Sequence, residues 1–262
     1  MFGNRSSRRI LRAIFGRQHY IALINMWKYY YNFCDNLVRY LTGNGKYPYE
    51  IELKTPTGTL KPTLYCHDDL LTVNEIFCRN DYPANAGTKT IVDLGSNIGI
   101  SALYFLSRND FCKCYLFEPD KRNIEKLKMN LKGYESRYFL EEAAVSYEAG
   151  QLNFGIESTG RYGGIGLKMD EQIIVDCLNI NDVLNKILEK EDYIDILKID
   201  TEGIEQQTVK AIESTLLDRI KYIYIESHPD HELFPGKFYQ KQYGSVCQFE
   251  NRLNQQLYDR EN

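Results

Sequence analysis

A run of polar and glycine residues directly after a short apolar segment gives the clearest sign of chemistry in this 262-residue chain. The apolar segment is Thr90-Ile91-Val92, and the run is Asp93-Leu94-Gly95-Ser96-Asn97-Ile98-Gly99. Glycine at position 95 lets the backbone turn sharply and approach a ligand closely. We expect Asn97 to begin a helix whose free N–H groups favour an anion such as a carboxylate, while Asp93 can receive an ammonium group.

The spacing within and after this run indicates which ligand it holds. The run lacks the G-x-G-x-x-G pattern of dinucleotide-binding loops and the Gly-Lys-Ser/Thr ending of a P-loop, which disfavours a nicotinamide-dependent oxidoreductase. Glu118 lies 23 residues after Gly95 and closes a second apolar run. An acid at about this spacing can accept both hydroxyl groups of a ribose. Pro119 is expected to begin the next helix. Together these features predict a pocket for S-adenosylmethionine.

Four further residues are candidates for the reaction itself, because they follow two later apolar runs, residues 194–199 and 222–225. They are Asp200, Glu202, Glu226 and His228. Methyl transfer from an activated donor needs alignment of the reactants and removal of a proton from the nucleophile. A positioned base contributes about 10²–10⁴-fold to such a step.

Other roles for these polar residues stay open. Lys198 can simply pair with a neighbouring acid, and Glu202 can cap the helix that follows it. His228 can be an ordinary loop histidine. The acids together with His228 and His231 carry ligand atoms for a metal ion, but their spacing matches no compact ligand motif. We therefore predict no metal site.

Strands and helices alternate after residue 88, and near-continuous apolar strands of this kind form a parallel sheet covered on both faces. We predict an α/β fold with a doubly wound, mostly parallel sheet. The predicted parts are an N-terminal helical extension (residues 1–50), a lead-in hairpin and helix (51–88), and the S-adenosylmethionine-binding domain (89–262). In the N-terminal part we expect one helix over 18–42, a hairpin over 51–64 and a helix capped by Asp68 or Asp69. In the domain that follows we expect extra strands at 151–154 and 173–175, with a lid in the Gly-rich loop 155–166 near them. We also expect one helix from Glu205 to Leu217.

Composition limits the classes of partner and compartment. A net charge of −4 argues against a dedicated nucleic-acid binder. The seven cysteines lack metal or redox spacing, so we expect reduced thiols and a cytoplasmic location. The Arg-rich start has no signal-peptide cleavage site, and its apolar stretch is too short to cross a bilayer. Residues 5–42 suit contact with a membrane surface, but packing on the domain or on a second subunit is favoured, since aromatic residues at helical spacing usually pack.

The motifs resemble those of the FkbM-type family of S-adenosylmethionine-dependent methyltransferases. The resemblance rests on residues 91–99, on Phe117-Glu118-Pro119 and above all on residues 197–205, and it extends over about residues 57–228. It implies the class I methyltransferase, Rossmann-like fold, and it places Glu142 where such enzymes contact the adenine. The methyl-donor site that we expect comprises Asp93, Gly95, Ser96, Asn97, Gly99, Glu118 and Glu142.

The resemblance does not name the acceptor. Members of the family are best known as O-methyltransferases on hydroxyls of sugars, glycans and secondary metabolites, so we expect a small-molecule or glycan acceptor and no nucleic acid. The alternatives are an N-methyltransferase on a polymer and a methyltransferase-fold protein that binds partners without catalysis. The last is suggested by the chain from Pro229 onward, which reads as polar and helical and shows no final strand pair of this fold.

Overall fold

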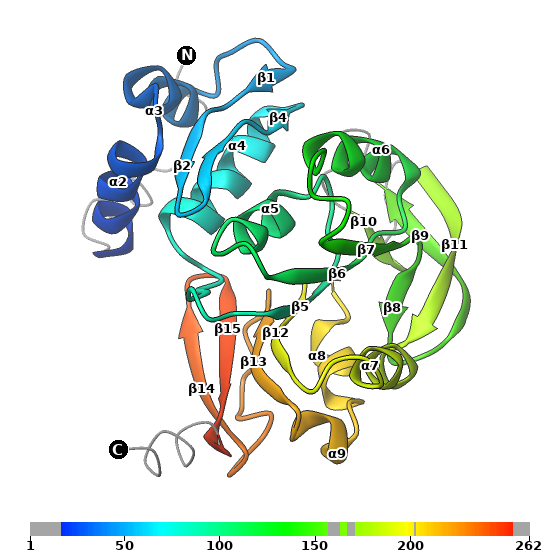
Figure 1. Cartoon of the computed structure of the whole chain (residues 1–262). Coiled ribbons are helices and arrows are strands. Elements are labelled where there is room, and N and C mark those ends of the chain that lie inside the picture. Colours follow the sequence, from blue (N-terminus) through cyan, green and yellow to red (C-terminus); the bar gives the residue numbers. More distant parts are fainter. Residues whose placement is uncertain (1–16, 157–162, 167–170, 202, 254–262) are drawn as a thin grey trace. The chain divides into compact units, whose positions relative to one another are not determined.

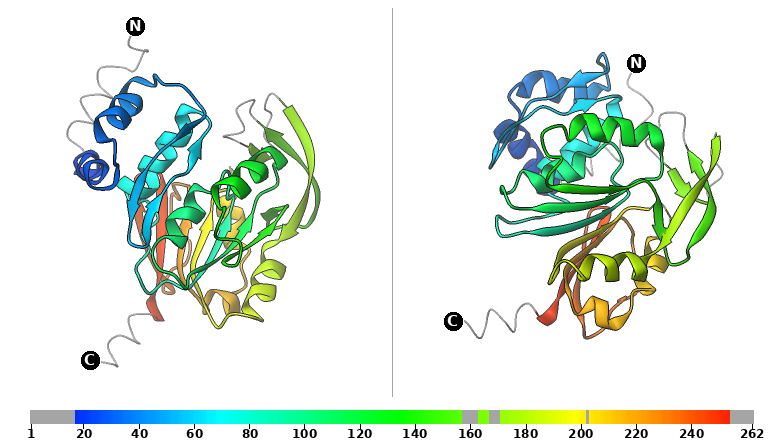
Figure 2. Two further views of the ribbon diagram at one scale, coloured as in Figure 1. Left: turned by 45° about the horizontal axis from the view of Figure 1, so that its top comes forward. Right: turned by 45° about the vertical axis from the view of Figure 1, so that its right-hand side comes forward.

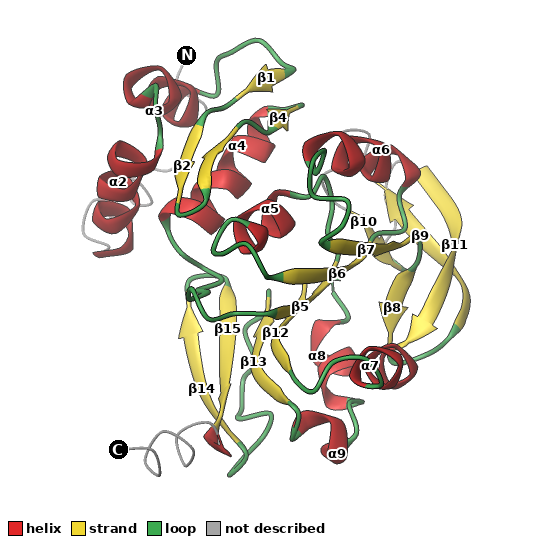
Figure 3. Ribbon diagram, viewed as in Figure 1, coloured by secondary structure: helices red, strands yellow, loops and turns green. Residues whose placement is uncertain are grey.

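The computed structural model of the protein describes residues 17–156, 163–166, 171–201 and 203–253. The chain forms two compact units, residues 1–83 and 84–262, coloured along the sequence in Figure 1 and by element type in Figure 3. The predicted site residues all belong to the larger unit.

The larger unit is built on a seven-stranded sheet with the order β14-β15-β13-β12-β5-β6-β7. The strands are Thr90–Leu94 (β5), Lys113–Phe117 (β6), Tyr138–Glu141 (β7), Ile194–Ile199 (β12), Ile220–Ile225 (β13), Phe238–Tyr243 (β14) and Val246–Asn251 (β15). Among these described strands β15 alone runs opposite to the other six, because it pairs antiparallel with both β13 and β14. The predicted doubly wound, mostly parallel sheet is confirmed.

Helices cover both faces of this sheet, with α5 and α6 on one face and α7, α8 and α9 on the other (Figures 1 and 2). They are Ile100–Leu106 (α5), Lys121–Asn130 (α6), Ile180–Leu188 (α7), Glu205–Lys210 (α8) and Ser214–Leu217 (α9). Strands β5 and β12 are buried at every position. Parallel strands enclosed in this way are usually apolar throughout, so their charged residues, Asp93, Asp195 and Lys198, need partners inside the protein.

A second sheet of four strands follows β7 in the sequence, with the order β10-β9-β11-β8. Its strands are Ala144–Ser146 (β8), Gly150–Ile156 (β9), Gly163–Ile165 (β10) and Glu171–Asn179 (β11). The strands predicted at 151–154 and 173–175 are confirmed within β9 and β11. Half of the Gly-rich loop for which we predict a lid, residues 157–162, lies outside the described residues, so that role stays a prediction.

The chain after Pro229 forms a hairpin, so the expectation of a polar helical segment without a final strand pair is wrong. Strands β14 and β15 pair around the two-residue turn Gly244-Ser245, where Gly244 has a φ of 61°. Strand β14 lies at the edge of the sheet and exposes most of its side chains, which explains why its sequence reads as polar. A glycine-containing two-residue turn between such segments is a hairpin signal.

Helices α8 and α9 replace the single helix expected from Glu205 to Leu217, which corrects that expectation. The break lies at residues 211–213, where the side chain of Asn181 bonds the backbone twice. Its Nδ2 donates to the carbonyl of Ala211 at 2.9 Å, and its Oδ1 accepts from the N–H of Glu213 at 2.9 Å. A contact from α7 therefore satisfies the backbone groups that the break leaves without helical partners.

The smaller unit contains short strands and helices. They are Arg17–Tyr29 (α2), Phe33–Thr42 (α3), Tyr49–Glu50 (β1), Leu53–Thr55 (β2), Gly58–Leu60 (β3), Thr63–Leu64 (β4), His67–Val73 (α4) and the π-helical turn Asn74–Cys78 (η1). Pairing of β2 with β3 confirms the hairpin predicted over residues 51–64. The single helix expected over 18–42 is wrong, because the chain leaves the helix at Tyr30, which is buried and forms a β-bridge with Leu53.

The cap of helix α4 also differs from the prediction. Cys66 occupies the N-cap position, and Asp69 lies in the first helical turn. The Oδ2 atom of Asp69 accepts from the N–H groups of Tyr65 (2.6 Å) and Cys66 (3.1 Å). The acid therefore stabilises the helix start from inside the first turn, as the acidic partner of a capping box does.

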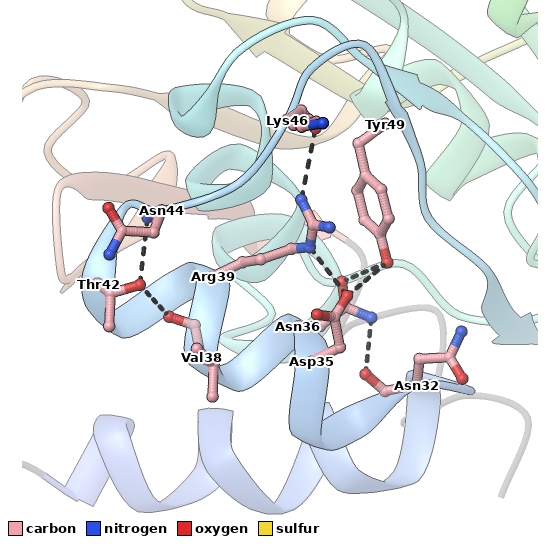
Figure 4. A network of polar contacts seen from close by, with 9 residues as sticks. All are labelled: Asn32, Asp35, Asn36, Val38, Arg39, Thr42, Asn44, Lys46 and Tyr49. Atoms are coloured by element: carbon pink, nitrogen blue, oxygen red, sulfur yellow. Dashed lines mark hydrogen bonds and ion pairs between the residues drawn. The ribbon is translucent and has the colours of Figure 1, made fainter.

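A network of polar contacts fixes helix α3 against the segment that follows it (Figure 4). The Nε of Arg39 donates to Asp35 at 2.9 Å, and its guanidinium lies 4.0 Å from the ring centroid of Tyr49. The hydroxyl of Tyr49 donates to Asn36 Oδ1 at 3.1 Å. Exposed ion pairs contribute little to stability, so this network chiefly sets the direction in which the chain leaves α3.

The seven cysteines form no disulfide in the structure. No helix in the described ranges combines the length and the apolar character needed to cross a bilayer.

We expect Phe249→Ala in strand β15 to lower the free energy of unfolding by about 3–5 kcal/mol. Phe249 is fully buried, and its ring stands edge-on to that of Phe234 with the centroids 5.5 Å apart. Tyr239→Ala, on the exposed side of the same hairpin, is the matched control and should cost less than about 1 kcal/mol. Urea denaturation followed by circular dichroism measures both. Equal losses would show that the hairpin is not part of the core.

Candidate active site

Apart from Glu142, which follows β7, the predicted site residues that the structure describes lie at or after the carboxyl ends of β5, β6, β12 and β13. The chain winds from β5 outward through β6 to β7, then returns to the other side of β5 with β12 and β13. The strand order therefore reverses between β5 and β12. In open α/β sheets ligands bind outside the carboxyl ends of the strands at such a switch point.

A buried ion pair joins the two strands at this point. Asp93 and Lys198 are direct partners in the parallel pairing of β5 with β12, so their side chains lie on the same face of the sheet. The Nζ of Lys198 lies 3.0 Å from Asp93 Oδ1, and Ser101 of helix α5 donates to Asp93 Oδ2 at 2.5 Å. Both carboxylate oxygens of Asp93 therefore have a partner, and Asp93 is fully buried.

Lys198 also connects this pair to the loop and to Asp200. Its Nζ donates to the carbonyl of Gly95 at 3.0 Å and lies 3.2 Å from Asp200 Oδ2. Burial lowers the pKa of Lys198, but the charges of Asp93 and Asp200 outweigh burial and raise it, so the side chain is a cation. The pairing of Lys198 with neighbouring acids is the interpretation that the structure supports. The carboxylate of Asp93 is paired with the ammonium group of Lys198, and its predicted contact with an ammonium group of the ligand stays a prediction.

The glycine at position 95 permits contact with the neighbouring strand. Its φ is +80°, and a Cβ atom placed there would lie 2.0 Å from the carbonyl oxygen of Asp200. The backbone N–H groups of Gly95 and Ser96 both donate to the carbonyl of Phe117, at 3.0 and 3.1 Å. The Ser96 hydroxyl donates back to the carbonyl of Asp93 at 2.9 Å. The loop is therefore fixed from β6 on one side and from β12 on the other.

Asn97 lies in this loop and does not begin the helix, which corrects the prediction. It has a φ of 47°, a left-handed conformation that asparagine adopts more readily than most residues. The N-cap of α5 is Gly99, where a Cβ atom would lie 3.2 Å from Leu127 in α6. Asn130, at the end of α6, donates to the carbonyl of Ile98 at 2.9 Å. Gly99 thus permits close packing of α6 against the loop.

Glu118 closes the second strand and faces the same loop. Its Oε2 accepts from the N–H of Asn97 at 2.8 Å, and its Oε1 accepts from the N–H of Asp120 at 3.0 Å. Burial raises the pKa of Glu118 to about 7, although the two backbone hydrogen bonds lower it. The N-cap of α6 is Asp120, so the expectation that Pro119 begins this helix is wrong by two residues.

Glu142 lies directly after β7 at the surface. Its Oε1 atom accepts from Lys128 at 2.9 Å, and both side chains are about half exposed. The predicted contact with adenine stays a prediction.

A polar groove of about 520 Å³ opens at the ends of β12 and β13. It is lined by Gly203, Glu205, Gln206, Gln207, Lys210, Glu226 and Ser227. Of the four predicted reaction residues, Glu226 lines this groove and is exposed, whereas Asp200 stands three residues before Gly203 and pairs with Lys198. His228 is exposed beyond the end of β13. Glu202 lies outside the described residues.

No cluster of three or more His, Cys, Asp or Glu residues suited to a metal ion occurs in the part of the chain that the structure describes.

Two polar residues of this region were not singled out from the sequence. The hydroxyl of Ser101 donates to Asp93. The sequence feature that could have pointed to it is a serine in a helix whose seven residues are all buried. Gln206 donates to the hydroxyl of Ser227 at 2.8 Å and so links α8 to the end of β13. A surface glutamine in a polar helix carries no comparable signal, because only the tertiary fold brings the two residues together.

The polar groups at the ends of β5 and β6 suit the binding of S-adenosylmethionine. A buried carboxylate at the end of β6 can exchange backbone partners for the two hydroxyls of a ribose, and its loop neighbours offer backbone N–H groups. A doubly wound sheet with this strand order, a glycine loop after the first strand and an acid after the second defines a class I, Rossmann-like methyltransferase.

Comparison with known proteins agrees with this class. The model of the methyltransferase FkbM domain matches residues 93–257, more than half of the chain. The chain therefore belongs to the FkbM methyltransferase domain family.

Two curated relatives are recognisable in sequence. The AMB antimetabolite synthetase AmbE of Pseudomonas aeruginosa is 24% identical over 226 residues, covering 68% of this chain and 10% of that protein. The 2-O-methyltransferase NoeI of Sinorhizobium fredii is 26% identical over 166 residues, covering 56% of this chain and 66% of that protein. The matches therefore span less than two thirds of the length of either relative.

Solved structures resemble the chain more weakly. Methyltransferase FkbM from Methylobacillus flagellatus has a TM-score of 0.41 and 13% identity, covering 70% of this chain and 54% of its own. A methyltransferase from Geobacter sulfurreducens has a TM-score of 0.37 and 14% identity, covering 64% and 73%. At these scores they add nothing to what the strand order already shows.

We expect Gly95→Ala to destabilise the fold and to abolish binding of S-adenosylmethionine. A left-handed φ costs a non-glycine residue about 1–2 kcal/mol, and here the new Cβ also collides with Asp200. Gly133→Ala is the matched control, because Gly133 has a φ of +93° with no atom within 4 Å of the added Cβ. Thermal unfolding and calorimetric titration measure both variants. The contact with Asp200 is unimportant if the two variants lose the same stability.

We expect the stability of the protein relative to Glu118→Gln to fall as the pH rises from about 4.5 to 7. The folded-state pKa of Glu118 is raised above 4.5 to about 7, so its contribution is fully present below the lower value and is lost through the higher one. The full change corresponds to about 3 kcal/mol. Urea denaturation of both proteins at several pH values tests this. A difference that does not change with pH would contradict the buried, protonated carboxyl.

Proposed function

We propose that this protein is an S-adenosylmethionine-dependent O-methyltransferase whose acceptor is a hydroxyl group of a sugar, a glycan or a hydroxyl-rich secondary metabolite. The observation that carries the acceptor class is the lining of the groove at the ends of β12 and β13. Its described side chains are carboxylates, amides, a hydroxyl and an ammonium group, and none of these described side chains is apolar. Such a lining offers both donors and acceptors to hydroxyl groups.

The donor is held, in this proposal, by the loop after β5 and by Glu118. When bound, S-adenosylmethionine supplies a methyl group already activated by a sulfonium. Glu118 accepts the ribose hydroxyls, while Lys198 holds the carbonyl of Gly95 and so fixes the loop. Asp93 acts as a positioning residue, because its carboxylate is buried against Lys198 and Ser101.

Glu226 is the proposed proton acceptor for the acceptor hydroxyl. It lines the polar groove and is exposed, so a hydroxyl in the groove can reach its carboxylate. Asp200 is held toward Lys198 and is better suited to fixing the end of β12. Proton removal at the nucleophile is the main chemical task left to a protein whose donor is already activated.

The 2-O-methyltransferase NoeI among the relatives supports transfer to oxygen. The two alternatives, transfer to nitrogen of a polymer and binding without catalysis, have less support. The second was suggested by a missing C-terminal strand pair, and β14 and β15 supply that pair.

The test has two stages. Calorimetric titration with S-adenosylmethionine and, separately, NAD should show binding of the first alone, and Glu118→Ala should abolish that binding. Transfer of a labelled methyl group is then screened across sugars, oligosaccharides, proteins and nucleic acids. We expect Glu226→Gln to reduce kcat by about 10²–10⁴-fold with donor affinity unchanged.

The control for Glu226 is Glu232→Gln, an exposed acid in the loop after β13 that lies outside the groove lining. It should leave kcat unchanged. Label in protein or nucleic acid alone would favour the N-methyltransferase, and donor binding without transfer to any acceptor would favour the interaction protein.

A further inference from the structure

Helix α2 of the smaller unit presents an apolar stripe on its outer side. The stripe consists of Tyr20, Leu23, Ile24 and Trp27, whose spacing of three or four residues places them on one helix face. All four are exposed, Ile24 by 63% and Trp27 by 70%. Tyr31, two residues beyond the end of the helix, is also exposed. Contiguous exposed apolar side chains of this kind indicate an interaction surface.

Packing within the unit does not explain this stripe, because α2 packs through other residues. Ala22, Met26 and Tyr30 are buried at a spacing of four. Asn25 donates to the carbonyl of Cys78 at 2.7 Å and so ties the helix to η1. The helix thus has two apolar faces. The face of Ala22, Met26 and Tyr30 packs inside the unit, whereas the stripe does not. A helix that is apolar on two faces needs a partner on the second.

The stretch of sequence that contains the stripe is positively charged. The first 34 residues contain six basic residues and no acidic one, although the whole chain has a net charge of −4. They are Arg5, Arg8, Arg9, Arg12, Arg17 and Lys28. Lys54 of β2 adds a further cation, with its Nζ 4.9 Å from the ring centroid of Tyr31. The neighbouring acid Glu52 is neutralised by Lys61 at 2.7 Å.

We propose that the stripe on α2 docks the protein on an anionic lipid bilayer. Ile24, Leu23 and the aromatic rings enter the boundary between headgroups and acyl chains, and the basic residues attract the lipid phosphates and carboxylates. Tryptophan and tyrosine combine an apolar ring with a polar edge, which suits this boundary. Apolar burial and attraction to anionic lipid act together in helices that lie in the membrane plane.

A second copy of the chain fits the stripe less well. Aromatic residues are common at protein interfaces, but lysine is depleted there. Here Lys28 is exposed on the same helix, and Lys54 lies over the exposed ring of Tyr31 just beyond it. This combination of aromatic, aliphatic and basic residues is that of an interfacial helix.

Trp27 makes the test specific, since it is the only tryptophan in the chain. The full chain is titrated with vesicles of phosphatidylcholine alone and with vesicles of equal parts phosphatidylcholine and phosphatidylserine. We expect a blue shift of the Trp27 emission and co-sedimentation with the mixed vesicles only. Both effects should weaken when salt is added, because salt screens the attraction between exposed charges.

The variant Ile24→Ser keeps both the charge and Trp27, and it should weaken binding to mixed vesicles by about tenfold. Ile174→Ser is the matched control, because Ile174 is 70% exposed on β11 of the other unit, and it should bind as the unchanged protein does. The proposal is overturned by absence of binding, by equal binding of Ile24→Ser, or by binding without a change in Trp27 emission. A dimer in light scattering that Ile24→Ser dissociates would assign the stripe to a second copy instead.

Discussion

The contact between Lys198 and Asp93 is the interaction on which the rest of the candidate site depends. The two charges lie in the middle of the sheet, at the place where the strand order reverses. Removing two charges from water is costly, and a buried ion pair is weak evidence for stability. Its effect here is on position. The ammonium group of Lys198 in β12 contacts Asp93 of β5, Asp200 after β12 and the carbonyl of Gly95, and so fixes the two strands and the glycine loop relative to one another.

From this pair the geometry of the donor side follows. Because Lys198 holds the carbonyl of Gly95, the loop lies against the backbone of Asp200, at a distance that only glycine allows. The turn that follows directs the N–H of Asn97 at Glu118. The carboxyl of Glu118, whose pKa burial raises to about 7, therefore accepts hydrogen bonds from backbone N–H groups when no ligand is bound. It can exchange these partners for the hydroxyl groups of a nucleoside.

The proposed acceptor groove is built differently, mostly from exposed and half-buried polar residues beyond the ends of β12 and β13. The described lining of the groove consists of side chains that form hydrogen bonds, and of its charged residues Glu205 is buried whereas Lys210 and Glu226 are exposed. This contrast fits a division of work in which the donor side is fixed by the core and the acceptor side is decided by surface residues. The smaller unit adds a surface of another kind, where apolar residues of α2 are exposed outside the core.

The sequence by itself determined the α/β class, the central strands, the loop from Asp93 to Gly99 and the acid at Glu118, because buried parallel strands and the turns after them have strong local patterns. It also proposed that Lys198 pairs with an acid. Only the tertiary structure decided that the partners are Asp93 and Asp200, that Asn181 divides the helix after β12, and that a polar-looking C-terminus is a hairpin. Each of these outcomes depends on residues distant in sequence, and local propensity carries no information about which distant group will satisfy a buried charge or a free backbone group.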